Sequence, residues 1–167
     1  MIVIIDYGMG NLRSVQKAFE AVGHEAEITA DPDRIRAATR VVLPGVGAFA
    51  DAMAELRRTG MDQAFTEAVQ SGKPCLGVCL GLQLLFTTSH EDGEHQGLDL
   101  IPGEVVRFEP RPGLKVPHMG WNTLAIRRPI PLFEGIDAEP SVYFVHSYYA
   151  RAGDPDDVAA TADYPEP

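Results

Sequence analysis

Short apolar runs alternate with stretches of helical spacing along the first half of the chain. Residues 1–5 are continuously apolar and rich in β-branched side chains, as in a strand covered on both faces. From Leu12 to Val22 the apolar residues recur every three or four positions, with Asn11 before and Gly23 after, which predicts a capped helix. Further strands are predicted at 26–29, 41–43 and 74–78, and further helices from residue 31 and over 49–58, 61–70 and 80–86.

The second half of the chain has a different pattern. Residues 87–97 are polar and acidic, which predicts a loop. Beyond it, segments rich in β-branched and aromatic residues are separated by prolines and glycines, as in antiparallel strands at the edge of a sheet. These segments are 104–108, 121–126, 141–149 and 158–162. Because strands and helices alternate before them, we expect one α/β domain over residues 1–167, with a mostly parallel sheet between helices.

Composition and charge argue against several classes of function. The chain has 167 residues, 45% of them hydrophobic, which suffices for one domain with a buried core. Its net charge of −10 repels phosphate backbones, so nucleic-acid binding is not expected. The apolar runs are too short to cross a bilayer, and no basic segment followed by a long apolar run opens the chain. We expect a cytoplasmic protein with no membrane partner.

The two cysteines, Cys75 and Cys79, are expected to be free thiols. Four residues of strand separate them by roughly 13 Å, which is too far for a disulfide. Without a matching Cys or His pair they also make a poor zinc site, so no metal or cofactor is expected. Cys75 is most simply a small core residue.

Cys79 stands in a Gly77-Val78-Cys79-Leu80-Gly81 segment between a predicted strand and a predicted helix. This is the cysteine version of the G-x-S-x-G nucleophile elbow, whose glycines remove side chains that would collide at a tight turn. The start of a helix also favours a thiolate. The alternative is a buried cysteine between two packing glycines.

A glycine-rich loop, Pro44-Gly45-Val46-Gly47, follows the strand that precedes this segment along the chain. Functional loops gather beyond the carboxyl ends of parallel strands, so the loop should lie near Cys79. Thiolate attack on an amide creates an oxyanion, which needs N–H donors. The N–H of Leu80 and one from the Val46–Gly47 region are the natural pair. The alternative is an ordinary turn.

Five segments in the same order along the chain resemble class I, or triad, glutamine amidotransferases, and among them the amidotransferase subunits of imidazole glycerol phosphate synthase. The segments are 6–12, 43–47, 73–83, 117–122 and 143–148. The resemblance implies a flavodoxin-like three-layer sandwich in which Cys79 attacks the side-chain amide of glutamine and Gly45-Val46-Gly47 forms the oxyanion loop. Ammonia would then pass to a partner, a cyclase subunit with a (β/α)8 barrel that makes imidazole glycerol phosphate in histidine biosynthesis.

The resemblance also implies roles for two further groups of residues. Candidates for holding the amino-acid end of glutamine are Gln83, Glu91, His146, Ser147 and Tyr148. Candidates for facing the barrel are Asn11, His118, Met119, Gly120, Trp121, Asn122 and Tyr143. Without the resemblance, Gln83 and Glu91 would be interpreted as solvated residues, and Trp121 and Tyr143 as core aromatics.

The family's histidine base and its orienting glutamate lie in a segment resembling Phe-His-Pro-Glu, and none of the five histidines here is followed by Pro-Glu. We therefore expect the C-terminal end of the family fold to be missing, one sheet edge to be exposed, and the glutaminase activity of these 167 residues to be negligible. Three alternatives stay open: an amidotransferase subunit for another acceptor, a non-catalytic scaffold subunit, and a redox-sensing thiol protein.

Overall fold

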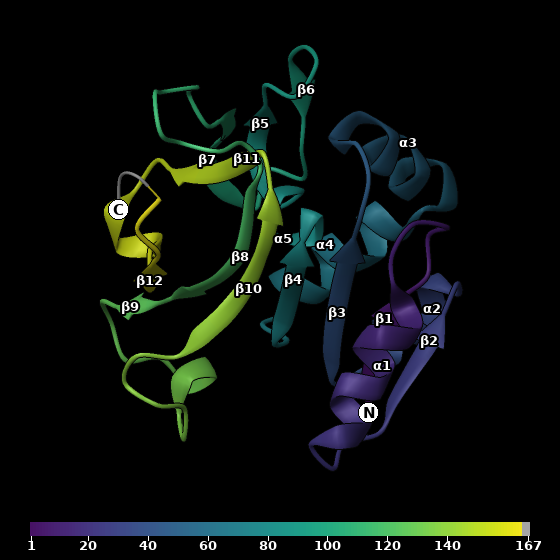
Figure 1. Cartoon of the computed structure of the whole chain (residues 1–167). Coiled ribbons are helices and arrows are strands. Elements are labelled where there is room, and N and C mark those ends of the chain that lie inside the picture. Colours follow the sequence, from purple (N-terminus) through teal and green to yellow (C-terminus); the bar gives the residue numbers. More distant parts are fainter. Residues whose placement is uncertain (165–167) are drawn as a thin grey trace.

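The computed structural model describes residues 1–164. In it, the strands of the first half of the chain form a four-stranded parallel sheet (Figure 1). The strands are β1 (Ile2–Ile5), β2 (Ala26–Thr29), β3 (Arg40–Gly45) and β4 (Cys75–Cys79), in the order β2-β1-β3-β4. All three pairings are parallel. The four strands predicted for this half are therefore confirmed.

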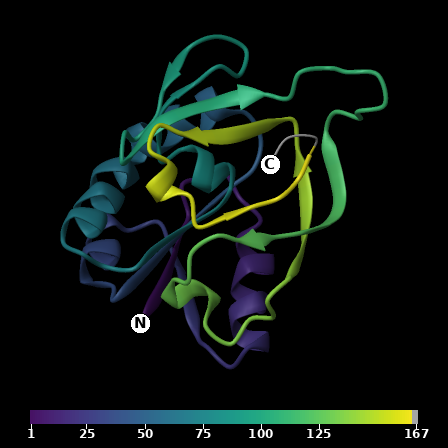
Figure 2. The ribbon, with the colours of Figure 1, turned by 90° about the vertical axis from the view of Figure 1, so that its left-hand side faces the viewer.

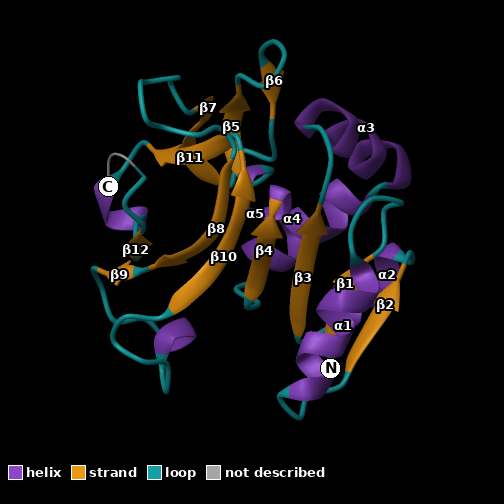
Figure 3. Cartoon of the chain, in the orientation of Figure 1, coloured by secondary structure: helices purple, strands orange, loops and turns teal. Residues whose placement is uncertain are grey.

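Helices cover both faces of this sheet, as Figure 3 shows. They are α1 (Leu12–Ala21), α2 (Pro32–Ala37), α3 (Phe49–Thr59) and α4 (Met61–Gln70). Ile4 of β1 packs towards α1, whereas Val3 and Ile5 pack with the buried residues of α2, α3 and α4. Successive side chains of a strand point to opposite faces, so a strand between two helical layers must be continuously apolar. This is why residues 1–5 show no alternation.

The predicted helix over residues 80–86 is wrong in its length. The helix α5 spans only Leu80–Gln83, and Phe86 already begins the strand β5 (Phe86–Ser89). The carbonyl of Leu85 accepts hydrogen bonds from the N–H groups of Leu100 and Ile101, at 2.9 and 3.0 Å. Both partners lie outside residues 80–86, so the apolar pattern of these residues could not predict where the helix ends.

The polar segment 87–97 also differs from its prediction as a loop. Its two ends form a small antiparallel ladder between β5 and β6 (His95–Gln96). Gly97, directly after β6, packs closely on β5: its N–H donates to the carbonyl of Thr87 at 2.9 Å, and a Cβ at this glycine would lie 2.1 Å from the carbonyl oxygen of Phe86. Only the tip between these strands is irregular.

The remaining strands are paired with one another beyond the β4 edge of the parallel sheet. They are β7 (Ile101–Arg107), β8 (His118–Thr123), β9 (Ala125–Ile126), β10 (Ser141–His146), β11 (Tyr148–Ala152) and β12 (Ala160–Thr161), with 3-10 turns η1 (Pro131–Phe133) and η2 (Pro155–Asp157). The pairs β11-β7, β10-β8 and β12-β9 are antiparallel, as predicted, and β5 joins β7 in parallel. β8 and β10 run side by side as a curved two-stranded ribbon, labelled in Figure 1 and turned by 90° in Figure 2.

Within residues 1–164, β4 pairs with β3 alone, so its other edge carries no strand. The same part of the chain holds no helix with the length and apolar character that a bilayer span requires. The open edge borders the residue at the end of β4, Cys79.

Candidate active site

Cys79 occupies a strained turn between β4 and α5. Its backbone angles are φ 57° and ψ −120°, a combination that residues other than glycine rarely adopt. Such strain costs about 1–3 kcal/mol and persists only where the surroundings impose it. The Cys79 side chain is exposed, and both cysteines are free, as predicted. Burial raises the pKa of the Cys75 thiol.

The two glycines of the segment are required by close backbone packing. A Cβ on Gly81 would lie 1.9 Å from the carbonyl oxygen of Leu43. A Cβ on Gly77 would lie 2.6 Å from the Cα of Leu82, on the other side of the turn. Real Cβ atoms do not approach so closely, so the turn is pressed against β3 and folded onto itself. The geometry matches the predicted nucleophile elbow.

The glycine-rich loop lies beside this elbow. The β3–β4 register pairs Gly45 with Cys79. A Cβ on Gly45 would lie 2.7 Å from the backbone nitrogen of Gly81, which leaves no space between the strand end and α5. Val46 is exposed, and Gly47 has a φ of 87°. The predicted neighbourhood of Cys79, the loop and the N–H of Leu80 is therefore present.

Glu91 is bonded to the helix that follows this loop. Its Oε2 accepts a hydrogen bond from the backbone N–H of Phe49, the first residue of α3, at 2.8 Å. The interpretation of Glu91 as a merely solvated residue is thus wrong. The cap was not predictable from the sequence because 42 positions separate its two partners.

Gln83, His146 and Tyr148 are brought together at a single carbonyl group. The carbonyl oxygen of Tyr148 accepts from Gln83 Nε2 at 2.9 Å and from His146 Nδ1 at 2.8 Å. The backbone of Ser147 is also held, because its carbonyl accepts a hydrogen bond from the N–H of Phe108 at 3.1 Å. Since Gln83 belongs to α5, the turn between β10 and β11 is fixed next to the elbow. Four of the five predicted substrate-binding residues are thus grouped here.

Comparisons with known proteins identify the family of this fold. The family profile described as Glutamine amidotransferase class-I matches residues 3–166. The chain belongs to this family. An imidazole glycerol phosphate synthase subunit HisH from Syntrophotalea carbinolica is 60% identical over 169 residues, which cover 98% of the chain and 82% of the relative. A subunit of the same name from Moorella thermoacetica is 55% identical over 163 residues, with 98% and 77% covered.

A solved structure with low sequence identity also supports the fold of the amidotransferase. A crystal structure described as a glutamine amidotransferase superposes with a TM-score of 0.73 at 18% identity, covering 96% of this chain and 79% of that one. At this identity the likeness concerns the fold alone. The class I glutamine amidotransferase fold expected from the sequence is confirmed.

The histidines that form hydrogen bonds within residues 1–164 of the amidotransferase pair with groups other than Cys79. His90 pairs with Glu104 at 2.8 Å, and His146 with the Tyr148 carbonyl. His118 lies 3.4 Å from an amide nitrogen of Asn122. The ring of His118 is stacked between Phe144 and Tyr164, with centroids 4.5 and 3.7 Å away. Burial lowers the pKa of His118.

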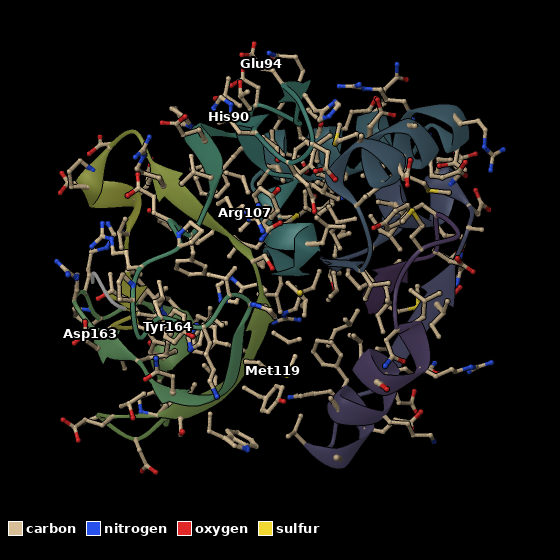
Figure 4. All side chains as sticks on the ribbon, turned by 45° about the horizontal axis from the view of Figure 1, so that its top comes forward. His90, Glu94, Arg107, Met119, Asp163 and Tyr164 are labelled. Atoms are coloured by element: carbon tan, nitrogen blue, oxygen red, sulfur yellow. The ribbon has the colours of Figure 1, made fainter. Side chains whose placement is uncertain are left out.

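The outer face of the β8–β10 ribbon of the amidotransferase is exposed and apolar. Trp121 is 72% exposed and stands opposite Tyr143, with ring centroids 5.7 Å apart at 80°. Met119, labelled in Figure 4, and Val145 form the next exposed pair. The interpretation of Trp121 and Tyr143 as core aromatics is therefore wrong.

The other residues predicted to face a partner are placed differently. His118 is buried on the inner face of the ribbon, and Gly120 lies between the exposed pairs. Asn122 donates to the carbonyl of Asp163 at 3.0 Å. Asn11 is exposed at the N-cap position of α1, but its side chain makes no capping hydrogen bond, contrary to the sequence-based prediction.

No group of three or more His, Cys, Asp or Glu side chains in the described part of the chain is placed to hold a metal ion. The site itself offers a thiol, backbone N–H donors and polar side chains. Such a set is suited to attack on a carbonyl carbon with stabilisation of the resulting oxyanion.

Proposed function

We propose that the chain is a single-domain glutaminase subunit, which hydrolyses glutamine to glutamate and ammonia for a cyclase subunit of imidazole glycerol phosphate synthase. One observation carries the proposal: an exposed thiol at a strained elbow stands beside the loop Pro44–Gly47. The identity to subunits named HisH supports the choice of acceptor.

In the proposed reaction the Cys79 thiolate attacks the side-chain carbonyl carbon of glutamine. The carbonyl electron pair moves to oxygen, and the oxyanion is met by the N–H of Leu80 and an N–H of the Val46–Gly47 region. Collapse of this intermediate breaks the C–N bond, and the leaving amine takes up a proton and departs as ammonia. Water then hydrolyses the γ-glutamyl thioester, which returns the thiol and releases glutamate.

The amino-acid end of glutamine would be held by Glu91 and by the residues grouped around α5. Glu91 supplies the negative charge that an α-ammonium group requires, and it uses one carboxylate oxygen on Phe49. Gln83 and His146 fix the carbonyl of Tyr148, so the backbone of the 146–148 turn is rigid before substrate arrives. A rigid turn presents its polar groups without a further entropic cost.

The partner would dock on the exposed face of the β8–β10 ribbon. Met119, Trp121, Tyr143 and Val145 together form a contiguous apolar surface, which is uncommon on a protein that works alone. Trp and Tyr are also the side chains that most often dominate binding energy at interfaces. A (β/α)8-barrel cyclase subunit is the proposed occupant.

We also propose that the glutaminase activity of these 167 residues is negligible. No histidine in them precedes Pro-Glu, and the histidine hydrogen bonds run to other groups. General acid–base help from a positioned histidine is worth about 10²- to 10⁴-fold. The same observation favours a second candidate, a subunit that binds glutamine and the barrel without appreciable turnover.

A glutamine-analogue affinity label tests the proposed site. The label should modify Cys79 and leave Cys75 unmodified, and excess glutamine should protect Cys79, as read by peptide mass. Ammonia release by the chain together with the barrel then separates the two candidates. Labelling of Cys75 alone, or of both thiols without protection by glutamine, would remove the proposal.

A further inference from the structure

The predicted oxyanion loop is flexible by composition. Val46 stands between two glycines, and Gly47 adopts a φ of 87°, which glycine reaches without steric cost. The peptide groups on either side of Val46 each join it to a glycine and rotate readily, so nothing within the loop keeps their N–H groups aimed at one point. An N–H stabilises an oxyanion strongly only if its direction is fixed before the charge develops. The restraint must therefore come from outside the loop.

Tyr7 supplies such a restraint at the first residue of the loop. Its side chain is fully buried, and its hydroxyl donates a hydrogen bond to the carbonyl of Pro44 at 3.1 Å. Burial raises the pKa of Tyr7 to about 12, so this hydroxyl remains a donor at neutral pH. Because a peptide unit is planar, holding the Pro44 carbonyl also orients the peptide that enters Gly45.

Two further contacts hold the end of the loop. The N–H of Phe49 is bonded to Glu91 at 2.8 Å, which fixes the start of α3. A Cβ on Gly47 would lie 3.0 Å from the terminal methyl of Met9, so this side chain packs directly on the loop backbone. Of these residues only Tyr7 is fully buried and holds the loop through a polar group of its own side chain.

We propose that Tyr7 is a positioning residue for the oxyanion loop, which keeps the loop N–H groups directed at the carbonyl attacked by Cys79. The proposal rests on the proposed roles of Cys79 and of this loop. A fully buried side chain does not contact glutamine, so Tyr7 acts through Pro44. Its effect should appear in reactions that generate an oxyanion and be absent from reactions of the same thiol that generate none.

The decisive experiment compares two reactions of Cys79 in the intact chain, both of which proceed without a histidine base. In the first, the thiolate attacks the γ-(4-nitrophenyl) ester of N-acetyl-L-glutamate. The new S–C bond places an electron pair on the carbonyl oxygen, and collapse expels 4-nitrophenolate with the pair of the broken C–O bond. In the second, the thiolate displaces iodide from iodoacetamide, which creates no oxyanion. Peptide mass assigns both products to Cys79.

Tyr7→Phe keeps the ring in the core and removes only the hydroxyl. The matched control is Tyr164→Phe, because the Tyr164 hydroxyl also donates to a backbone carbonyl, that of Lys115. We expect Tyr7→Phe to slow acylation about ten- to hundredfold, as for a small misplacement of a catalytic group, while alkylation changes less than about twofold. Tyr164→Phe should leave the ratio of the two rates unchanged.

Hydrogen exchange provides an independent measurement of the loop itself. The amides of residues 45–49 should exchange faster in Tyr7→Phe than in the original chain, and amides of α1 should not. Parallel losses of acylation and alkylation, or unchanged loop exchange, would overturn the role of Tyr7. If the original chain is not acylated at Cys79, the proposed function fails, and the exchange data still decide whether Tyr7 holds the loop.

Discussion

The strand β3 and the strand β10 use apolar residues in opposite ways. β3 buries five of its six residues in succession, because helices cover both of its faces. In β10 exposed and half-buried residues alternate, so one face of the ribbon is left open and displays Tyr143 and Val145. A strand held on both sides can fix a reactive turn at its end, whereas a strand held on one side can present a surface to another molecule.

The proposed chemistry accordingly lies at the ends of the strands that helices cover on both faces. Gly45 and Cys79 are register partners at the carboxyl ends of β3 and β4. The strain at Cys79 is tolerated because the surrounding packing is fixed. This division predicts that substitutions at the strand ends abolish reactivity, and that substitutions on the ribbon change association alone.

The largest expected effect is that of Cys79→Ala, which removes the nucleophile. Modification by a glutamine-analogue label should be lost completely, while the thermal midpoint changes little because the side chain is exposed. Cys75→Ala is the control and should keep the label. A Cys79→Ala chain that is still labelled at the same site would contradict the assignment of the nucleophile.

Gly81→Ala should destabilise the fold by several kcal/mol. The new Cβ would lie 1.9 Å from the Leu43 carbonyl oxygen, so the elbow or β3 must move, and overpacking of this kind costs about 1–3 kcal/mol or more. Gly60→Ala is a suitable control, because the site has open space and the variant should lose only the about 1–2 kcal/mol that a φ of 72° costs a residue with a Cβ. Urea denaturation of both variants measures the difference, and equal losses would rule out the clash.

Trp121→Ala should weaken binding to the barrel subunit by about 2 kcal/mol, roughly 30-fold, as for a central aromatic anchor. Because the side chain is 72% exposed, the free energy of unfolding of the isolated chain should change by less than about 0.5 kcal/mol. Val22→Ala, at a residue 70% exposed, is the matched control and should leave binding unchanged. Titration calorimetry with the barrel gives both affinities, and equal affinities would contradict docking on the ribbon.

The smallest expected effect concerns pH and His118. Burial lowers the pKa of His118 in the folded state, so the unfolded chain binds the proton more readily. The stability that depends on neutral His118 is thus present above the unfolded pKa of about 6.5 and is lost as the pH falls through the lower folded pKa. The thermal midpoint should fall between pH 7.5 and 5.5 by less in His118→Phe than in the original chain.

Many elements of the site could be predicted from local sequence. The apolar, β-branched runs predicted the parallel strands, because a strand between two helical layers has no polar face. The glycines around Cys79 indicated a turn too tight for side chains, and the structure has such a turn. Both inferences use neighbours within a few positions, which is the range over which sequence patterns carry information.

Other features were decided by tertiary contacts alone. The helix after Cys79 ends at Gln83 because the next residues are bonded to a strand more than ten positions away. Tyr7 bonds to Pro44 of the loop from 37 positions away along the chain, and Glu91 bonds to Phe49, just after the loop, from 42 positions away. Trp121 is exposed because no element of residues 1–164 covers that face of the ribbon. The sequence thus determined which residues can react, and the packing of distant segments determined how firmly the loop beside them is held.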